Sequence, residues 1–160
     1  KNKIIENLNN TENLYFKFEQ NINGKIENGN CTIEYPKKIF CEYASNNKIL
    51  VSNGKSLVIK TITSYYRYPL DKTPLNFVLD KELLIKKINV LEERIVDESL
   101  INYTIKENDI NINIFFNKKT HDLIGWQNTD AYQNFSITFI SSIRKNRILS
   151  KNIFKLPTQN

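Results

Sequence analysis

The stretch Cys31-Thr-Ile-Glu-Tyr-Pro-Lys-Lys-Ile-Phe-Cys-Glu-Tyr43 contains both cysteines of the chain and indicates two short strands that turn over at Pro36. Apolar and polar residues alternate on both sides of this Pro-Lys-Lys corner, which is typical of a β-hairpin. The predicted apolar face consists of Cys31, Ile33 and Tyr35 in the first strand and Ile39, Cys41 and Tyr43 in the second.

The two cysteines are placed symmetrically about Pro36. An odd-length loop centred there puts both sulfur atoms opposite each other on one face, whereas a two-residue loop sends one of them to the other face. We expect a disulfide between Cys31 and Cys41 and therefore an oxidising compartment. The alternative is a pair of buried free thiols in a cytosolic protein.

Length and composition are those of one globular domain that spans residues 1–160. A chain of 160 residues with 40% hydrophobic and 25% charged residues can bury a sizeable core. No apolar run approaches the length of a membrane-spanning helix. We expect no signal peptide in this sequence, and the start at Lys1 without a methionine fits a mature secreted chain and equally a shortened one.

The formal net charge of +6 admits two interpretations. One is a lysine- and asparagine-rich surface that reflects composition alone. The other is attraction to an acidic partner, such as anionic lipid head groups, an acidic protein face or nucleic acid. We expect no nucleic-acid partner, because the lysines are spread along the chain and no arginine-rich segment or binding motif accompanies them.

The pattern along the chain predicts roughly ten or eleven short strands and two or three short helices. Helical segments are expected at 1–10, at Thr73-Pro74 with Thr73 as N-cap, and at 81–87 with Asp80 as N-cap. Tyr65, Tyr66 and Tyr68 form an exposed run. The chain turns back at Asn23-Gly24 through 25–28 toward the hairpin, and strands are expected at 14–22, 31–35, 39–43, 48–51, 56–62, 88–90, 101–105, 110–116, 123–129, 134–142 and 152–157.

Catalytic chemistry is not indicated. The single histidine, His121, lies in a polar turn, where we expect a solvated side chain rather than a catalytic base. One histidine and two cysteines on opposed strands do not supply a zinc site, and four glycines do not supply a phosphate-binding loop. We expect no enzymatic activity, no metal and no cofactor.

Aromatic and aliphatic residues point one way along many of the predicted strands. An ordinary packed core is one interpretation, and an apolar cavity for a hydrophobic ligand is the other, because few helices are available to cover the sheet. Leu75 and Leu79, on one side of the predicted helical turn after Thr73, would close that cavity. The strand residues predicted to line it are Phe16, Phe18, Ile33, Tyr35, Ile39, Tyr43, Leu57, Ile59, Ile112, Ile114, Phe116, Trp126, Phe135, Ile137 and Phe139.

Several motifs, in the same order along nearly the whole chain, resemble the LolA family of periplasmic outer-membrane lipoprotein carrier proteins, and the last two resemble versions common among alphaproteobacterial members. These motifs are the Phe16-x-Phe18-x-Gln20 strand, the hairpin from Tyr35-Pro36 to Glu42-Tyr43, Val51-Ser-Asn-Gly-Lys-Ser-Leu57, Thr73-Pro74-Leu75 with Leu79, Leu123-Ile-Gly-Trp-Gln-Asn-Thr-Asp130, and Phe154-x-x-Pro157.

The resemblance implies a mainly β fold: an unclosed antiparallel β-barrel with a lid of short helices. It also implies a monomeric periplasmic chaperone that holds lipoprotein acyl chains in an apolar cavity and performs no chemistry. Cargo would come from an inner-membrane ABC-type lipoprotein release complex and pass to an outer-membrane receptor or directly to the outer membrane. Rival hypotheses are a barrel of the same shape that binds another lipid or a peptide in envelope-stress sensing, and a structural domain without a ligand.

The sequence departs from the family pattern in the hairpin. Family members often carry an arginine before the proline, linked to holding the lid, and Tyr35 stands at that position here. The common Phe-Arg-Trp run becomes Ile39-Phe40-Cys41. These departures put an arginine latch in doubt, and we expect a Cys31–Cys41 bridge to stiffen the strand pair instead.

Overall fold

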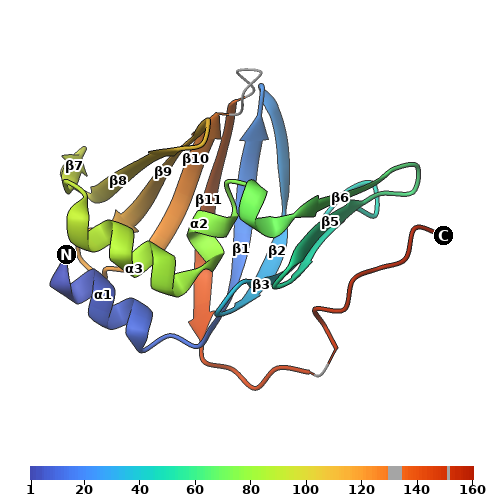
Figure 1. Ribbon diagram of the computed structural model, residues 1–160, viewed down its shortest axis with the longest axis horizontal. Coiled ribbons are helices and arrows are strands. Elements are labelled where there is room, and N and C mark those ends of the chain that lie inside the picture. The colour runs from blue at the N-terminus through green and yellow to red at the C-terminus, as the bar shows by residue number, and fades with distance from the viewer. Residues whose placement is uncertain (130–134, 151) are drawn as a thin grey trace.

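The computed structural model describes residues 1–129, 135–150 and 152–160 and consists of one curved antiparallel sheet with helices on its concave face (Figure 1). Its eleven strands follow the order β6-β5-β4-β3-β2-β1-β11-β10-β9-β8-β7. Because β6 and β7 lie at opposite ends of this order, the sheet is an unclosed barrel, as the sequence predicted.

The helices are α1 (Asn2–Asn9), the 3-10 helix η1 (Leu70–Lys72), α2 (Asn76–Leu79) and α3 (Lys81–Val90). The strands are β1 (Asn13–Ile22), β2 (Lys25–Glu34), β3 (Lys38–Tyr43), β4 (Ile49–Asn53), β5 (Ser56–Lys60), β6 (Tyr65–Pro69), β7 (Arg94–Val96), β8 (Leu100–Glu107), β9 (Ile110–Asn117), β10 (Leu123–Thr129) and β11 (Phe135–Lys145).

The cysteine hairpin joins β2 to β3 through a three-residue loop, since Glu34 pairs with Lys38. This odd-length loop places Cys31 opposite Cys41, with 4.1 Å between their Cα atoms, and the two sulfurs form a disulfide of 2.05 Å. The Tyr35-Pro36 peptide bond is cis, and Lys37 adopts a left-handed backbone at φ +72°. The disulfide fits an oxidising compartment.

Helices α1 and α3 cover the half of the sheet that runs from β7 to β1, and this half is packed solid. Ile4 and Leu8 of α1 and Leu84 and Ile88 of α3 are at most 6% exposed. They share a core with Tyr103 of β8 and other large side chains of β8 and β9. The spacing of the four helical residues is i, i+4 in each case, which explains why each helix buries one narrow stripe.

A polar cluster fastens α1 to the sheet. Asn7 donates its amide to the carbonyl of His121 and to the Asp122 carboxylate, each at 2.9 Å, and Lys145 of β11 forms an ion pair with the same carboxylate. Partial burial alone would raise the pKa of Asp122, but the bonds from Lys145 and Asn7 lower it below its usual value. His121 thus lies in a turn and contributes its backbone carbonyl.

Three local predictions are wrong. Residues 88–90 continue α3 rather than starting a strand, because Leu84 and Ile88 repeat at the helical period while Val90 points to solvent. Thr73 does not cap α2; its hydroxyl donates to the carbonyl of Leu70 and closes η1 instead. No strand forms at 152–157. The cap at Asp80 is confirmed, since its carboxylate accepts from the Leu83 amide at 3.2 Å.

The edge strands β6 and β7 were not predicted. Their side chains are mostly exposed, so their sequences do not show the alternation of apolar and polar residues that indicates a strand with one buried face. The predicted strand 134–142 extends further than expected, to Lys145, and its first residue, Asn134, lies outside the described residues.

The C-terminal segment after β11 lies along the outer face of β3–β6. The amine of Lys60 donates to the carbonyl of Thr158 at 2.6 Å, and the hydroxyl of Tyr65 donates to the carbonyl of Pro157 at 3.1 Å. Val51 and Val58 are cross-strand partners on this outer face and are at most 1% exposed. The C-terminal segment therefore covers the outer face of these strands and does not cover their inner face.

The disulfide predicts a measurable loss of stability on reduction. A bridge that closes a separation of 10 residues contributes about 2–3 kcal/mol in the loop-entropy model. Chemical denaturation with and without a reductant should show a loss of that size, and a Cys31→Ala/Cys41→Ala variant should not respond to the reductant. Equal midpoints for the oxidised and reduced wild type would contradict this role.

Candidate ligand-binding cavity

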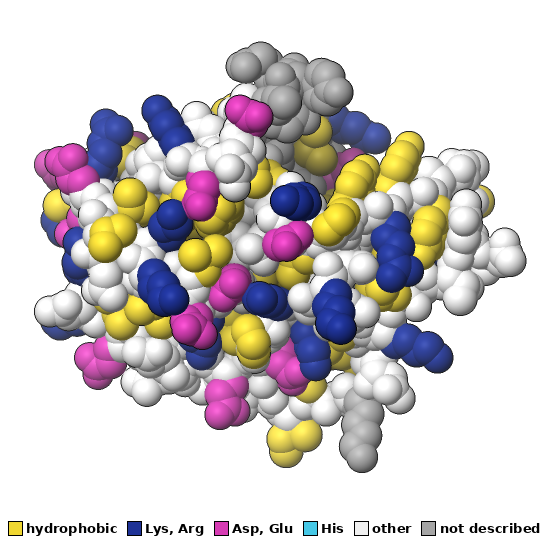
Figure 2. All heavy atoms as spheres, in the orientation of Figure 1, with side chains coloured by type: hydrophobic (Ala, Val, Ile, Leu, Met, Phe, Trp, Pro, Cys, Tyr) yellow, Lys and Arg dark blue, Asp and Glu magenta, His cyan; other side chains and the backbone are white. Residues whose placement is uncertain are grey.

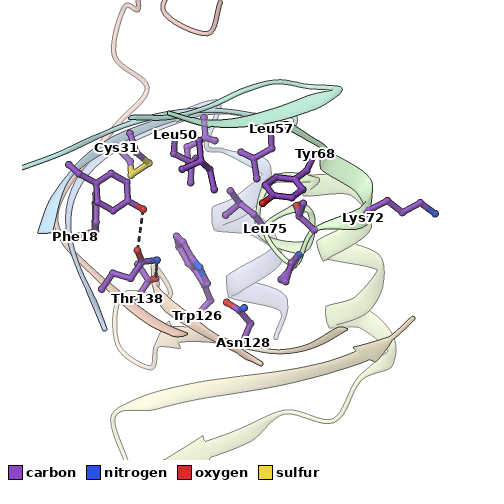
Figure 3. A pocket seen from close by; sticks show the side chains of 17 residues that line it. Phe18, Cys31, Leu50, Leu57, Tyr68, Lys72, Leu75, Trp126, Asn128 and Thr138 are labelled. Atoms are coloured by element: carbon purple, nitrogen blue, oxygen red, sulfur yellow. Dashed lines mark hydrogen bonds between the residues drawn. A yellow bond between two sulfur atoms is a disulfide. The ribbon is translucent and has the colours of Figure 1, made fainter. Parts of the chain in front are cut away.

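The half of the sheet that α1 and α3 leave uncovered holds a cavity of about 440 Å³ (Figure 3). This volume is within the range of small-molecule sites, about 300–1,000 Å³. The cavity is bounded by the inner face of β1–β6, by β10 and β11, and by the segment around η1. Its lining consists of Phe18, Gln20, Cys31, Ile39, Cys41, Tyr43, Leu50, Leu57, Ile59, Tyr68, Lys72, Thr73, Pro74, Leu75, Trp126, Asn128 and Thr138.

Most of the wall is apolar because the inner-facing positions of neighbouring strands are in register. Leu50 of β4 lies opposite Ile59 of β5, and the Cys31–Cys41 disulfide forms part of the same surface. Phe18 and Tyr43 meet edge to face, with 4.9 Å between ring centroids. Such a wall offers dispersion contacts and removal of apolar surface from water, which is what an extended hydrophobic ligand requires.

One chain of hydrogen bonds interrupts the apolar wall. The Tyr43 hydroxyl donates to the Gln20 side-chain oxygen at 3.1 Å, and the Gln20 amide donates to the Thr138 hydroxyl at 2.9 Å (Figure 3). Burial, together with the nearby Glu27 carboxylate, raises the pKa of Tyr43, so its hydroxyl stays protonated at neutral pH. This chain can hold a polar group of a ligand, and it contains no general base.

The cavity is covered by the lid, which is η1 and α2 (residues 70–79). Leu70 anchors the lid: it is 1% exposed, and its amide donates to the carbonyl of Lys55 at 2.9 Å. From there the chain passes over the cavity, with Leu75 in its lining. Lys72, an exposed residue, and Tyr68, 42% exposed, stand at the rim. Only a short, thin element therefore separates this part of the cavity from solvent.

The cysteine hairpin contacts the end of the lid. The Lys37 amide donates to the carbonyl of Leu79 at 2.9 Å, and its amine lies 3.7 Å from the Asp80 carboxylate. The amine of Lys81 lies 5.0 Å from the centroid of the buried Tyr35 ring and donates to the carbonyl of Thr11 at 2.6 Å. Desolvation lowers the pKa of Lys81, with Glu12 opposing this effect. Lys37 thus links the hairpin to the end of the lid, whereas Tyr35, at the position where the resemblance placed an arginine, contacts Lys81 of α3.

The structure divides the predicted cavity residues into three groups. Those that line the cavity are Phe18, Ile39, Tyr43, Leu57, Ile59, Leu75 and Trp126, together with Cys31 and Cys41. Those that are buried in the adjoining core and do not line it are Phe16, Ile33, Tyr35, Leu79, Ile112, Ile114 and Phe116. Those on the outer face of the sheet are Phe135, Ile137 and Phe139.

The placement of Phe135, Ile137 and Phe139 in the cavity is wrong. Thr138 pairs with Gln20 and with Trp126, both of which line the cavity, so its neighbours in β11 point outward. Phe139 is 43% exposed and stacks on Phe115 with 6.4 Å between ring centroids. We predicted that the bulky apolar side chains of β11 point into the cavity. The β11 side chain that lines the cavity is instead Thr138, whose hydroxyl accepts a hydrogen bond from Gln20.

Polar members of the lining were missed. Gln20 continues the inward alternation of Phe16 and Phe18, which was the available signal. Thr138 and Asn128 carry none, because small and polar residues do not mark the inner face of a strand. Within residues 1–129, 135–150 and 152–160, no group of acidic, cysteine or histidine side chains could hold a metal ion. No helix in that part of the chain is long and apolar enough to cross a membrane.

Comparison with known proteins identifies one matching family. The profile of the family described as "Outer membrane lipoprotein carrier protein LolA" matches residues 9–157. No curated protein sequence is significantly similar to the chain.

Solved structures share the fold at low sequence identity. A LolA superfamily protein from Nitrosomonas europaea has a TM-score of 0.51 and 9% identity, with 97% of each chain covered. An uncharacterized conserved protein from Thermus thermophilus has a TM-score of 0.55 and 6% identity over 99% of this chain and 94% of that one. The Pseudomonas aeruginosa MucA/MucB complex contains a chain with a TM-score of 0.50 and 10% identity, over 98% of this chain and 59% of that one.

A hollow site and a packed site should respond differently to added volume. Leu57→Phe adds bulk beside the cavity, and we expect the free energy of unfolding to stay within about 0.5 kcal/mol of the wild type. Leu84→Phe makes the same change under α3, where the side chain is 0% exposed, and should cost about 1–3 kcal/mol. Denaturant unfolding of the two variants checks this. Equal losses would mean that the cavity is filled.

Proposed function

The chain belongs to the LolA family, because the family profile matches residues 9–157, and from this premise we propose that it carries lipoproteins with their acyl chains in the cavity. The observation that supports this most directly is an apolar hollow of about 440 Å³ beneath a thin lid. The remaining side chains of the cavity suit binding and no reaction, so we propose a carrier and not an enzyme.

Binding energy for this task comes from the apolar wall. Each methylene removed from water contributes about 0.8 kcal/mol, so even a partly inserted acyl chain is held well. Tight binding creates a need for release, which an acceptor must drive by offering the acyl chain a better site. The lid must open for both steps, and its few backbone bonds with Lys55 and Lys37 make that movement inexpensive relative to unfolding the core.

The periplasm is the proposed compartment, since the disulfide requires oxidising conditions and the family is one of outer-membrane lipoprotein carriers. The proposed partners are an inner-membrane ABC-type lipoprotein release complex as donor, and an outer-membrane receptor or the outer membrane itself as acceptor. The carrier would act as a monomer.

A second candidate is a sensing module that binds a peptide or another lipid. It draws on the fold shared with the MucB chain of the MucA/MucB complex, whose TM-score is about the same as that of the LolA superfamily protein. The chain spans 59% of that MucB chain. The two candidate functions can be distinguished by experiment, because a lipoprotein carrier requires the acyl chains of its ligand and a peptide-sensing module does not.

Trp126 offers a direct test, because it is the single tryptophan of the chain and lines the cavity. A synthetic lipopeptide with brominated acyl chains should quench its fluorescence saturably, since bromine quenches only at short range. The same peptide without acyl chains should not compete. Quenching should be lost in an Ile59→Asp/Leu75→Asp variant, which places two carboxylates in the apolar wall that the acyl chain would contact.

Phe139→Asp is the matched control on the outer face and should leave the quenching unchanged. Loss of quenching in Phe139→Asp, or persistence in the Ile59→Asp/Leu75→Asp variant, would show that the ligand does not occupy the cavity. Equal competition by the peptide without acyl chains would favour the sensing module.

A further inference from the structure

The wing of the sheet that forms the cavity wall, residues 43–70, contains no acidic residue. Its charged residues are Lys48, Lys55, Lys60 and Arg67. Lys48 is balanced by Glu27 of β2 at 3.2 Å, and Lys60 is bonded to the carbonyl of Thr158, whereas Lys55 and Arg67 are exposed. Residues 43–70 therefore carry a formal charge of +4 in a chain whose net charge is +6, which favours contact with an acidic surface.

The same wing exposes large apolar side chains. Ile62, in the turn between β5 and β6, is 77% exposed, and Tyr66 and Tyr68 of β6 are 53% and 42% exposed. The two tyrosine rings are nearly parallel, with an interplanar angle of 10° and 6.4 Å between centroids. Figure 2 shows hydrophobic and basic side chains next to each other over this part of the molecule. Because β6 is an edge strand, side chains from both of its faces lie along this edge, with Tyr66 and Tyr68 on the inner side and Arg67 on the outer side. We name the edge surface that consists of Lys55, Ile62, Tyr66, Arg67, Tyr68 and Lys72 the basic tyrosine patch.

The basic tyrosine patch continues into the cavity. Tyr68 and Lys72 belong both to the patch and to the rim of the cavity. Asp71 is the acidic residue next to this rim in sequence, and it is adjacent to Lys72. A ligand that enters or leaves past η1 therefore passes between exposed tyrosines and lysine side chains.

We propose that the basic tyrosine patch docks the protein on an anionic phospholipid bilayer, with the rim of the cavity turned toward the membrane. Tyrosine prefers the interface between water and bilayer, where its ring contacts the hydrocarbon and its hydroxyl remains hydrated. Lysine and arginine are attracted to anionic head groups. Ile62, at the tip of a turn, can insert between head groups without any change of the fold.

The position of the patch gives the docking a purpose. An acyl chain that left the cavity into water would lose the stabilisation of about 0.8 kcal/mol for every methylene exposed. With the rim against the bilayer, the chain passes from one apolar environment to another. This docking role rests on the proposed carrier function, whereas bilayer binding itself is a property of the empty protein and can be measured alone.

Flotation with vesicles tests the proposal. We expect the wild type to bind vesicles of phosphatidylethanolamine and phosphatidylglycerol, to bind phosphatidylcholine vesicles far less, and to lose binding as salt shortens the Debye length from about 10 Å at 0.1 M to about 3 Å at 1 M. Lys55→Gln/Arg67→Gln should lower the partition coefficient by at least roughly tenfold. Ile62→Asp should lower it by a similar factor.

Matched controls separate the patch from overall charge and exposed apolar area. Lys118→Gln/Lys119→Gln removes the same charge from an exposed turn, and Ile148→Asp changes an isoleucine that is 102% exposed. Both should bind vesicles as the wild type does. Absence of binding by the wild type, or equal losses in patch and control variants, would overturn the proposal, including the case in which the patch serves an acidic protein instead.

Quenching of Trp126 by the brominated lipopeptide in detergent-free solution keeps the two proposals apart. The patch variants should still bind the lipopeptide, because Lys55, Ile62 and Arg67 do not line the cavity. Normal lipopeptide binding with no vesicle binding in the wild type would refute membrane docking alone. Vesicle binding without lipopeptide quenching would refute the carrier function and leave the docking surface in place.

Discussion

The structure depends on a mismatch between the concave face of an eleven-stranded sheet and the helices available to cover it. Helices α1 and α3 bury one stripe each and fill the half from β7 to β1. The half from β1 to β6 receives only η1 and α2, which are three and four residues long. A face with apolar side chains and so little cover cannot close on itself, because the curved backbone is held by its ladder of hydrogen bonds. The hollow is thus a consequence of the element lengths, and the disulfide hairpin at its wall keeps the curved strands in register.

The division into a solid and a hollow half also explains where stability and function reside. Side chains beneath α1 and α3 are buried in a packed core. The hydrogen bond from Asn7 to Asp122 and the ion pair between Asp122 and Lys145 connect α1 to the sheet in that half. The lid is connected to the sheet by backbone bonds between Leu70 and Lys55 and between Leu79 and Lys37 of the hairpin. A protein built in this way can open its lid while its core stays folded, since the free energies of the two events are carried by different residues.

Much of the fold was accessible from the sequence because alternation in β1, β3 and β9 is strong and turn dipeptides punctuate it. The disulfide register followed from the symmetric placement of two cysteines about Pro36. The error in β11 arises because alternation identifies two faces and does not say which one is inside. In β11 the apolar residues Phe135, Ile137 and Phe139 face outward and Thr138 faces the cavity, because a hollow interior favours hydrogen bonding to Gln20 over bulk. A second error concerns the period of the pattern. Ile88 and Val90 are two residues apart, as in a strand, but Leu84 and Ile88 are four residues apart, as in a helix, and both residues lie in α3.

The central claim is that acyl chains occupy the hollow half and leave the solid half untouched. Isotope-edited NMR of the protein with a bound lipopeptide measures this directly through nuclear Overhauser effects from the acyl-chain protons. The account predicts contacts with the Trp126 indole and with the methyl groups of Leu57 and Leu75, and none with Leu84 or Ile88. Contacts confined to Ile137 and Phe139 on the outer face, or contacts with the residues beneath α3, would contradict it.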